Sequence, residues 1–227
     1  MEANEVASQV SLATHPSMAG FGVETVERAL GELRQGRLVV VTDDESRENE
    51  GDLIMAAQFA SQATLAFVVR YSSGVVCASL PPDRLDALRL PPMVLNNEDP
   101  KCTAFAVTVD LKHGTTTGIS AADRAATFRA LADPASTADM FSRPGHVFPL
   151  RPRPGGVLER DGHTEATVDL CRLAGLEPCG LLCEVVNDDG TMSRVPELTK
   201  FCKEHGLVLT SIADIIAYRK AREGITS

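Results

Sequence analysis

The sequence predicts an α+β domain, a mixed α/β sandwich in which one mixed sheet is flanked by helices. The length of 227 residues fits a single domain with a proper core. Hydrophobic residues make up 44% of the chain and charged residues 23%, as in ordinary globular proteins. Helical and strand patterns interchange without a strict β-α-β order. We expect a loose lead-in at residues 1–20, the domain at 21–222 and a tail at 223–227.

The first third of the chain alternates between helix and strand patterns. Apolar residues spaced three and four apart predict an amphipathic helix over residues 23–35, which ends at Gly36. Short apolar runs at 38–42 and 53–57 predict two buried strands on either side of a polar segment. A helix at 61–70 and a strand at 74–80 are expected next.

The remaining two thirds contain a long irregular region between regular elements. Apolar and polar residues alternate over 105–111, which predicts a half-buried strand. Ser120 begins a predicted helix that runs to about residue 131. Prolines mark a connection at 81–92, and residues 143–163 are rich in Arg, Gly and Pro, which predicts a long structured loop. The later predictions are a helix at 164–174, a strand at 181–187, a helix at 196–205, a strand at 207–210 and a last helix from Ser211.

The charge balance disfavours several classes of protein. Lys plus Arg number 22 against 31 for Asp plus Glu, a net charge of −9, and aromatic residues make up 4% with no Trp. Such a chain repels phosphate backbones and has few stacking platforms, so we expect no nucleic-acid partner. No apolar stretch reaches about 18 residues, so no membrane span is expected. Residues 1–20 contain Glu2 and Glu5 but no Lys or Arg, unlike a secretory signal, and we expect a cytoplasmic protein.

The six cysteines favour a reducing compartment. None form a C-x-x-C pair, and the closest two are Cys179 and Cys183. That spacing is weak evidence for zinc, and most of the cysteines lie in apolar runs. We therefore predict reduced, buried thiols.

The first candidate site is the acidic segment at residues 43–52. Six of its ten residues are acidic, and buried strands flank it. A bound divalent cation would relieve the repulsion, and Mg²⁺ prefers carboxylate and substrate oxygens. If the segment is extended, Glu48, Glu50 and Asp52 lie on the same side. The alternative is a solvated loop tip.

The second candidate site is the helix start at Arg160-Asp161-Gly162-His163-Thr164. We expect Thr164 to cap the helix, whose free N–H groups form an anion cradle to which Arg160 adds a charged fork. His163, beside the positive helix end, is expected to be neutral and able to bind a metal. The alternative for His163 is an ordinary surface residue.

Three further features carry weaker signals. Glu184 stands in the apolar run 181–186, where burial favours proton transfer, although it could also lie on a solvent-facing side of the strand. His146 lies in the loop that leads to the anion cradle. The segment 115–120 before a capped helix could form a second anion contact or an ordinary turn.

Four segments in order carry a family resemblance over residues 20–222: DDESRENEGD (43–52), TTGISAADR (116–124), RPGHVFP (143–149) and DGHTEA (161–166). They resemble the 3,4-dihydroxy-2-butanone 4-phosphate synthase family of riboflavin biosynthesis. Many relatives continue into a GTP cyclohydrolase II domain, whereas this sequence ends at Ser227. We therefore expect it to resemble the stand-alone form.

The resemblance implies a lyase that converts D-ribulose 5-phosphate to 3,4-dihydroxy-2-butanone 4-phosphate and formate. The family's steps are enediolate formation, dehydration, skeletal migration and loss of C4. The resemblance also implies two Mg²⁺ per site, which Mn²⁺ can replace, and a homodimer with its sites at the interface.

Residue roles follow from the same resemblance. It implies that Glu48 and His163 hold the metals and that His146 and Glu184 are essential to catalysis. The residues that it implies for substrate binding are Arg47, Glu48, Asp52, Arg160, Asp161, Gly162, His163, Thr164 and Glu184.

Two other functions remain open from the residues. One is a different metal-dependent enzyme acting on a sugar phosphate, such as an isomerase or aldolase, which would not release formate. The other is a non-enzymatic nucleotide- or RNA-binding module, which the net charge of −9 disfavours.

Overall fold

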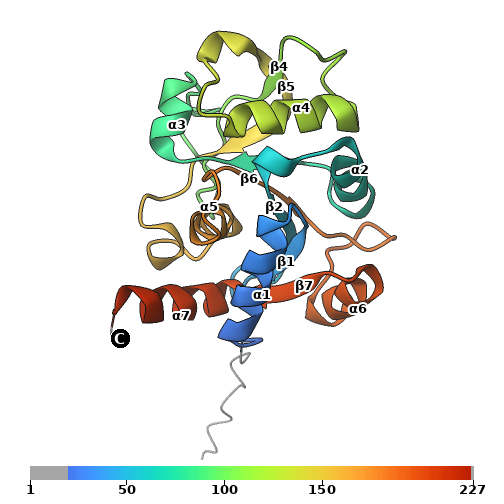
Figure 1. The fold of residues 1–227 in the computed structure, drawn as a ribbon, viewed down its shortest axis with the longest axis vertical. Helices are drawn as coiled ribbons and strands as arrows, with labels where there is room; N and C mark the ends of the chain where they lie inside the picture. Colours follow the sequence, from blue (N-terminus) through green and yellow to red (C-terminus); the bar gives the residue numbers. More distant parts are fainter. Residues whose placement is uncertain (1–19, 226–227) are drawn as a thin grey trace, which may run out of the picture.

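A seven-stranded mixed sheet forms the centre of the structure, a computed structural model that describes residues 20–225 (Figure 1). The strand order is β4-β5-β3-β6-β2-β1-β7. Pairs β1–β7 and β3–β5 are parallel and the other four are antiparallel, which confirms the predicted mixed sheet. The strands are β1 (Val39–Thr42), β2 (Gly51–Ala56), β3 (Cys77–Ser79), β4 (Val109–Leu111), β5 (Phe141–Leu150), β6 (Gly180–Glu184) and β7 (Val208–Ser211).

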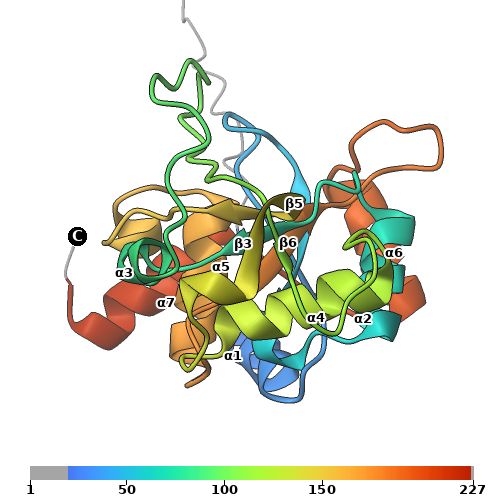
Figure 2. The ribbon, with the colours of Figure 1, turned by 90° about the horizontal axis from the view of Figure 1, so that it is seen from above.

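Helices cover both faces of the sheet. The α-helices are α1 (Val23–Arg34), α2 (Gln62–Tyr71), α3 (Pro82–Ala87), α4 (Ala121–Ala132), α5 (His163–Leu173), α6 (Val195–His205) and α7 (Ile212–Glu223). Thr167 of α5 packs against Gly180, whereas Leu198 of α6 packs against Gly51 on the opposite face. Helices α1 and α7 lie on the same face of the sheet as α5, and Figure 2 shows α2, α4 and α6 on the opposite face of the sheet.

The central strands are buried on both faces, which explains why their sequences are continuous apolar runs. Every residue of β1 and β2 is buried, and so are the first four residues of β6. The antiparallel pairing of β2 with both β1 and β6 places the start of β2 between the ends of β1 and β6. The start of α5 reaches this end of the sheet, since His163 Nε2 lies 3.1 Å from the carbonyl oxygen of Val41, which is paired with Asp52.

Three predicted elements differ from the structure. The loop predicted at 143–163 overlaps β5, which is an inner strand of the sheet. Pro149 is tolerated there because the pairing with β3 requires no N–H from this residue, and its carbonyl accepts the Ala106 N–H at 2.8 Å. The connection at 81–92 contains α3, which begins with proline at its first turn. Of the strand predicted at 105–111, only Val109–Leu111 forms β4, and an isolated bridge involves Phe105.

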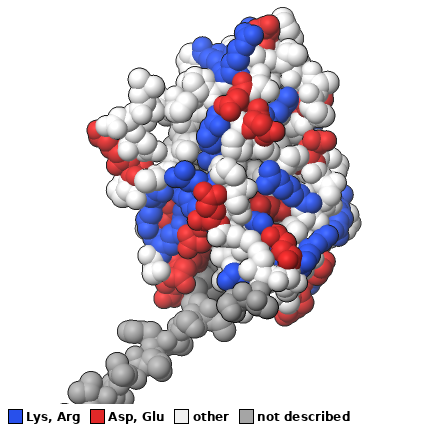
Figure 3. Space-filling model, turned by 90° about the vertical axis from the view of Figure 1, so that its left-hand side faces the viewer, with Lys and Arg blue, Asp and Glu red and all other residues white. Residues whose placement is uncertain are grey.

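Several composition-based expectations can be compared with the structure. All six cysteines are free and five of them are buried, as predicted, while Cys102 is exposed. No helix among residues 20–225 is both long and apolar enough to cross a membrane. Basic and acidic side chains are interleaved over the face seen in Figure 3. The predicted lead-in, apart from Gly20, lies outside the described residues.

Candidate active site

The acidic segment is a folded loop that joins β1 to β2. Asp43 organises it: one carboxylate oxygen accepts from Arg47 Nη1 at 2.9 Å and from the Glu48 N–H at 3.0 Å, and the other accepts from the Glu50 N–H at 2.8 Å. Asn49 has a φ of 57°, in the left-handed region that Asn tolerates better than most residues. The extended conformation considered from the sequence is therefore wrong, and Glu50 does not line the cavity described below.

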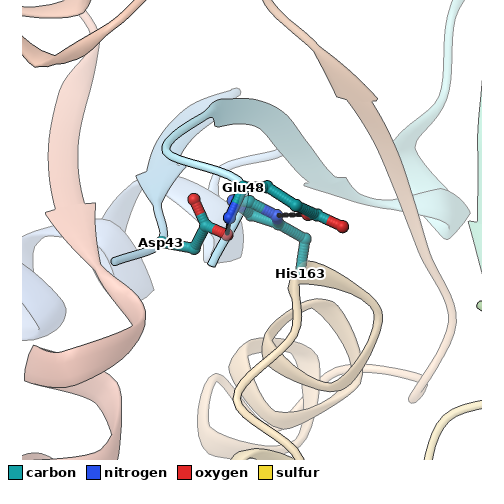
Figure 4. Close-up of side chains that lie close together, drawn as sticks. All are labelled: Asp43, Glu48 and His163. Carbon is teal, nitrogen blue, oxygen red and sulfur yellow. Dashed lines mark hydrogen bonds and ion pairs between the residues drawn. The ribbon is translucent and has the colours of Figure 1, made fainter. Parts of the chain in front are cut away.

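His163 is the first residue of α5, and its ring lies beneath the acidic loop (Figure 4). Its Nε2 lies 3.1 Å from the Val41 carbonyl oxygen, which can only accept a hydrogen bond, so Nε2 carries a proton. The other ring nitrogen, Nδ1, lies 3.7 Å from Glu48 Oε2 and 3.8 Å from Asp52 Oδ1. The fold thus directs Nδ1 at two carboxylates, and His163 is buried rather than a surface residue.

These three groups shift one another's pKa values. The interaction with the nearby His163 ring, together with the charge of Arg47, lowers the pKa of Glu48 to about 2. Burial raises the pKa of Asp52 to about 8. Burial alone would lower the pKa of His163, but the charge of Asp52 and the nearby Glu48 carboxylate outweigh it and raise the pKa to about 9. The expectation of a neutral His163 is therefore wrong for the metal-free protein, because the carboxylates outweigh the helix end.

The donor set fits a hard cation. Asp43, Glu48 and His163 each offer a ligand atom, and these atoms lie within 4.8 Å of one another. Asp52 Oδ1 is buried and has no hydrogen-bond partner among the described residues, an arrangement that a cation or its water shell would satisfy. The oxygens of Asp43 already accept three loop hydrogen bonds. Asp43 is thus engaged within the loop, whereas Glu48 and His163 direct ligand atoms at the cluster and Val41 orients the imidazole.

Beside this cluster, the start of α5 offers hydrogen-bond donors. The helix begins at His163 with Gly162 as its N-cap, so the prediction that Thr164 caps it is wrong. Backbone N–H groups at the first three helical positions have no acceptor within residues 20–225. Arg160 Nη1 donates to Glu165 Oε2 at 2.6 Å, which holds the guanidinium next to these groups. The arrangement suits an anion.

A cavity joins the cation cluster to the anion cradle. Glu184 enters it from β6, where the register pairs it with Asp52, and its Oε2 accepts a hydrogen bond from Ser73 Oγ at 2.6 Å. Asp161 and Gly162 lie outside the lining. The lining residues are Arg47, Glu48, Asp52, Cys77, Thr103, Phe105, Leu150, Arg160, His163, Thr164, Leu182 and Glu184.

Sequence reasoning assigned no site role to Cys77, Thr103, Phe105, Leu150 or Leu182. Four of the five are apolar residues or buried thiols of the kind that fill any core, so residue type alone gives no signal. The strand register identifies two of these residues: Leu182 is paired with Cys77 on β3 and lies two residues before Glu184. Strand alternation therefore puts Leu182 and Glu184 on one face.

His146 lies on β5 and is not among the residues that line the cavity. Its Nδ1 is 2.7 Å from Asp110 Oδ2 on β4. Next to this pair, the segment 115–120 forms a turn rather than an anion cradle, because the N–H groups of Thr116 and Gly118 donate to Asp123. Of the two alternatives for this segment, the structure favours the turn.

Comparisons with known proteins agree with one another. A sequence model of 3,4-dihydroxy-2-butanone 4-phosphate synthase matches residues 27–218. The chain is 60% identical over 206 residues to the riboflavin biosynthesis protein RibBA of Salinispora tropica, covering 91% of this chain and 51% of that protein. It is 54% identical over 203 residues to the 3,4-dihydroxy-2-butanone 4-phosphate synthase of a Shewanella species, covering 89% of this chain and 93% of that protein. The chain spans about half the length of the RibBA relatives.

Solved structures show the same fold. A crystal structure of 3,4-dihydroxy-2-butanone 4-phosphate synthase in complex with two magnesium ions is 46% identical, with a TM-score of 0.86 over 88% of this chain and 99% of that one. The fold and the site define an α+β enzyme domain with a candidate cation site beside an anion-binding helix start. More specifically, the chain belongs to the 3,4-dihydroxy-2-butanone 4-phosphate synthase family of riboflavin biosynthesis.

Proposed function

We propose that the protein converts D-ribulose 5-phosphate to 3,4-dihydroxy-2-butanone 4-phosphate and formate. One observation carries the proposal: His163 Nδ1 lies within 4 Å of a carboxylate oxygen of Glu48 and of Asp52, next to the N–H groups at the start of α5 that have no acceptor within residues 20–225. A sugar phosphate needs both a cation on its oxygens and a cradle for its phosphate. The reaction balances without an external oxidant or organic cofactor, because the two-electron oxidation of C4 to formate is matched by the two-electron reduction of C1 from a hydroxymethyl to a methyl group.

We assign Glu48 and His163 as ligands of Mg²⁺, two ions per site, with Mn²⁺ as a substitute. The relative solved with two magnesium ions supports this assignment. When bound, the cations would stabilise negative charge on adjacent substrate oxygens. Arg47, which donates to Glu48 Oε2 at 2.6 Å, holds this carboxylate over the imidazole. Asp52, whose pKa burial raises to about 8, would lose its proton when a cation binds and would then add a negative charge to the buried site.

The phosphate is assigned to the start of α5. Arg160 supplies a positive charge that Glu165 fixes in place, and Thr164 adds a hydroxyl beside the N–H groups of the first turn. Asp161 and Gly162 form the bend that brings Arg160 to the helix. This places the phosphate on one side of the cavity and the sugar oxygens on the side of Glu48.

Proton transfer is assigned to Glu184 and His146. Glu184 reaches the cavity from the end of β6, and Ser73 orients its carboxylate. His146 does not line the cavity of its own chain, which supports a homodimer in which a second copy of the chain supplies this imidazole.

Mixing inactive variants tests the dimer. Glu48→Ala mixed with His146→Asn should regain activity, to about a quarter of wild type for random pairing, because one site per mixed dimer is intact. Glu48 and His163 lie in one chain, so Glu48→Ala mixed with His163→Ala is the control that should regain none. Absence of recovery in the first mixture, with subunit exchange verified, would contradict shared sites.

Formate release from D-ribulose 5-phosphate, measured with Mg²⁺ and with a chelator, tests the activity itself. We expect formate and the four-carbon ketone phosphate in equal amounts, and neither with the chelator. An isomerase or aldolase would give sugar-phosphate products without formate, and that result would replace the proposed reaction. The boundaries at residues 21 and 222 and the cytoplasmic location remain predictions.

A further inference from the structure

A histidine and an aspartate form a two-point contact at one edge of the sheet. Asp110 Oδ2 lies 2.7 Å from His146 Nδ1, and Asp110 Oδ1 accepts the backbone N–H of His146 at 2.8 Å. Both oxygens of one carboxylate are therefore used on a single residue. The contact fixes the ring and the backbone of His146 together.

An irregularity in the pairing of β4 with β5 makes this contact possible. The register between β4 and β5 pairs Val109 with Val147 and then jumps to pair Asp110 with Ser142. A side chain at Gly145 would put a Cβ 2.0 Å from the Val109 carbonyl carbon, so glycine is required for the two strands to approach here. The bulge leaves the His146 N–H outside the ladder, and the Asp110 carboxylate takes it.

Residues on the side away from His146 also restrict the Asp110 carboxylate. Asp110 is 8% exposed. Gly118, with a φ of 93°, lets the turn before α4 close over it: a Cβ at this position would lie 2.0 Å from Asp110 Oδ2. Arg124, on the first turns of α4, is also buried and exerts an attractive charge interaction on Asp110. His146, in contrast, keeps 41% of its side chain exposed, so the ring has an open edge.

We propose that Asp110 is a positioning residue that fixes the tautomer of His146 and leaves Nε2 as the proton-accepting atom. This proposal rests on the catalytic role proposed above for His146. A carboxylate oxygen only accepts hydrogen bonds, so in the neutral ring Nδ1 carries the proton and Nε2 keeps its lone pair. The second oxygen, on the His146 N–H, prevents the carboxylate from turning away.

Asp110→Asn reverses the tautomer by the same geometry. The His146 N–H requires an acceptor, so the amide oxygen of the asparagine must take the place of Oδ1. The NH₂ group then faces Nδ1 and donates to it, which moves the ring proton to Nε2. The control is Asp214→Asn, because Asp214 is also buried and accepts backbone N–H groups, from Phe21 and Gly22, but lies beside β7 at the opposite edge of the sheet.

The tautomer is measured by ¹⁵N NMR of the histidine rings, with His146 assigned by its absence in His146→Asn. We expect an Nδ1–H tautomer in wild type and Asp214→Asn, and an Nε2–H tautomer in Asp110→Asn. We also expect kcat to fall about 10²-fold or more in Asp110→Asn, with KM and Mg²⁺ affinity unchanged, since the ring would no longer accept a proton.

An Nε2–H tautomer in the wild type would overturn the proposal, and that result does not depend on whether Asp110→Asn folds. A wild-type kcat in a folded Asp110→Asn would overturn it as well. If the wild type releases no formate, the proposed function fails, whereas the spectra still decide whether Asp110 fixes the ring.

Discussion

Replacing Arg160 with alanine is expected to weaken both substrate binding and the fold. Arg160 Nη1 donates to Glu165 Oε2 at 2.6 Å, and its Nη2 donates to the Lys101 carbonyl at 3.0 Å. The Glu165 side chain is 1% exposed, and its other oxygen accepts the Arg153 N–H at 2.9 Å. Removing Arg160 therefore leaves a buried carboxylate with a single hydrogen bond.

The two effects have separate magnitudes. Breaking a buried ion pair costs about 3–5 kcal/mol, and we take the lower value because Arg160 is 16% exposed. At 2–4 °C per kcal/mol for a domain of this size, Tm should fall by about 6–12 °C. Loss of a charged hydrogen bond to the phosphate costs about 1.5–3 kcal/mol, which lowers kcat/KM by about 10- to 150-fold.

A second substitution separates the effects. In the double variant Arg160→Ala with Glu165→Gln, the stranded group is neutral, so Tm should recover by more than half. The kcat/KM for formate release should stay low, because the phosphate still lacks its guanidinium. Glu165→Gln alone is the matched control. Calorimetry gives Tm, and initial rates give kcat/KM.

Two results would refute this reasoning. If Arg160→Ala leaves KM and kcat/KM near wild type, the anion cradle is not at the start of α5. If the double variant regains kcat/KM together with Tm, Arg160 acts only through the fold, and its assignment to the substrate is wrong.

Three further predictions concern the metal and the proton transfers. Glu48→Ala and His163→Ala should each abolish Mg²⁺-dependent formate release in a folded protein, and near-normal turnover in either would remove it from the ligand set. Glu184→Gln should lower kcat about 10²-fold or more and slow hydrogen exchange at C3 of the substrate in heavy water; exchange at the wild-type rate would exclude Glu184 as the first base. Mg²⁺ affinity should rise with pH up to about 9, because the raised pKa of His163 means that Nδ1 must lose a proton to bind the cation. Because Asp52, with a pKa of about 8, would also lose a proton, calorimetry at pH 7 in buffers of different ionisation enthalpy is run on Asp52→Asn, where the remaining proton release belongs to His163; no release there would contradict the assignment.

The regular elements with clear periodicity were predictable from the sequence. The helix at 23–35 and the strand at 38–42 lie within one residue of α1 and β1, because amphipathic spacing and apolar runs reflect what each element buries. β5 was not predictable in this way. Pro144, Gly145 and Pro149 are typical of loops, and only the neighbouring strands and their register make a strand of this segment.

The candidate site, too, was only partly predictable from the sequence. The acidic loop and the start of α5 are visible as residue types, and the fold brings Glu48, Asp52 and His163 together. The geometry within the loop depends on Asp43 accepting three hydrogen bonds, which no spacing rule indicates. His163 was expected to be neutral because a helix start is positive, but the sequence does not show that two carboxylates would face its ring.

The most direct test of the proposed reaction follows one carbon atom. D-ribulose 5-phosphate labelled with ¹³C at C4 is incubated with the protein and Mg²⁺, and the products are identified by NMR. We predict that the label appears in formate and that the ketone phosphate carries none. Label retained in the phosphorylated product, with unlabelled or no formate, would contradict the proposed reaction.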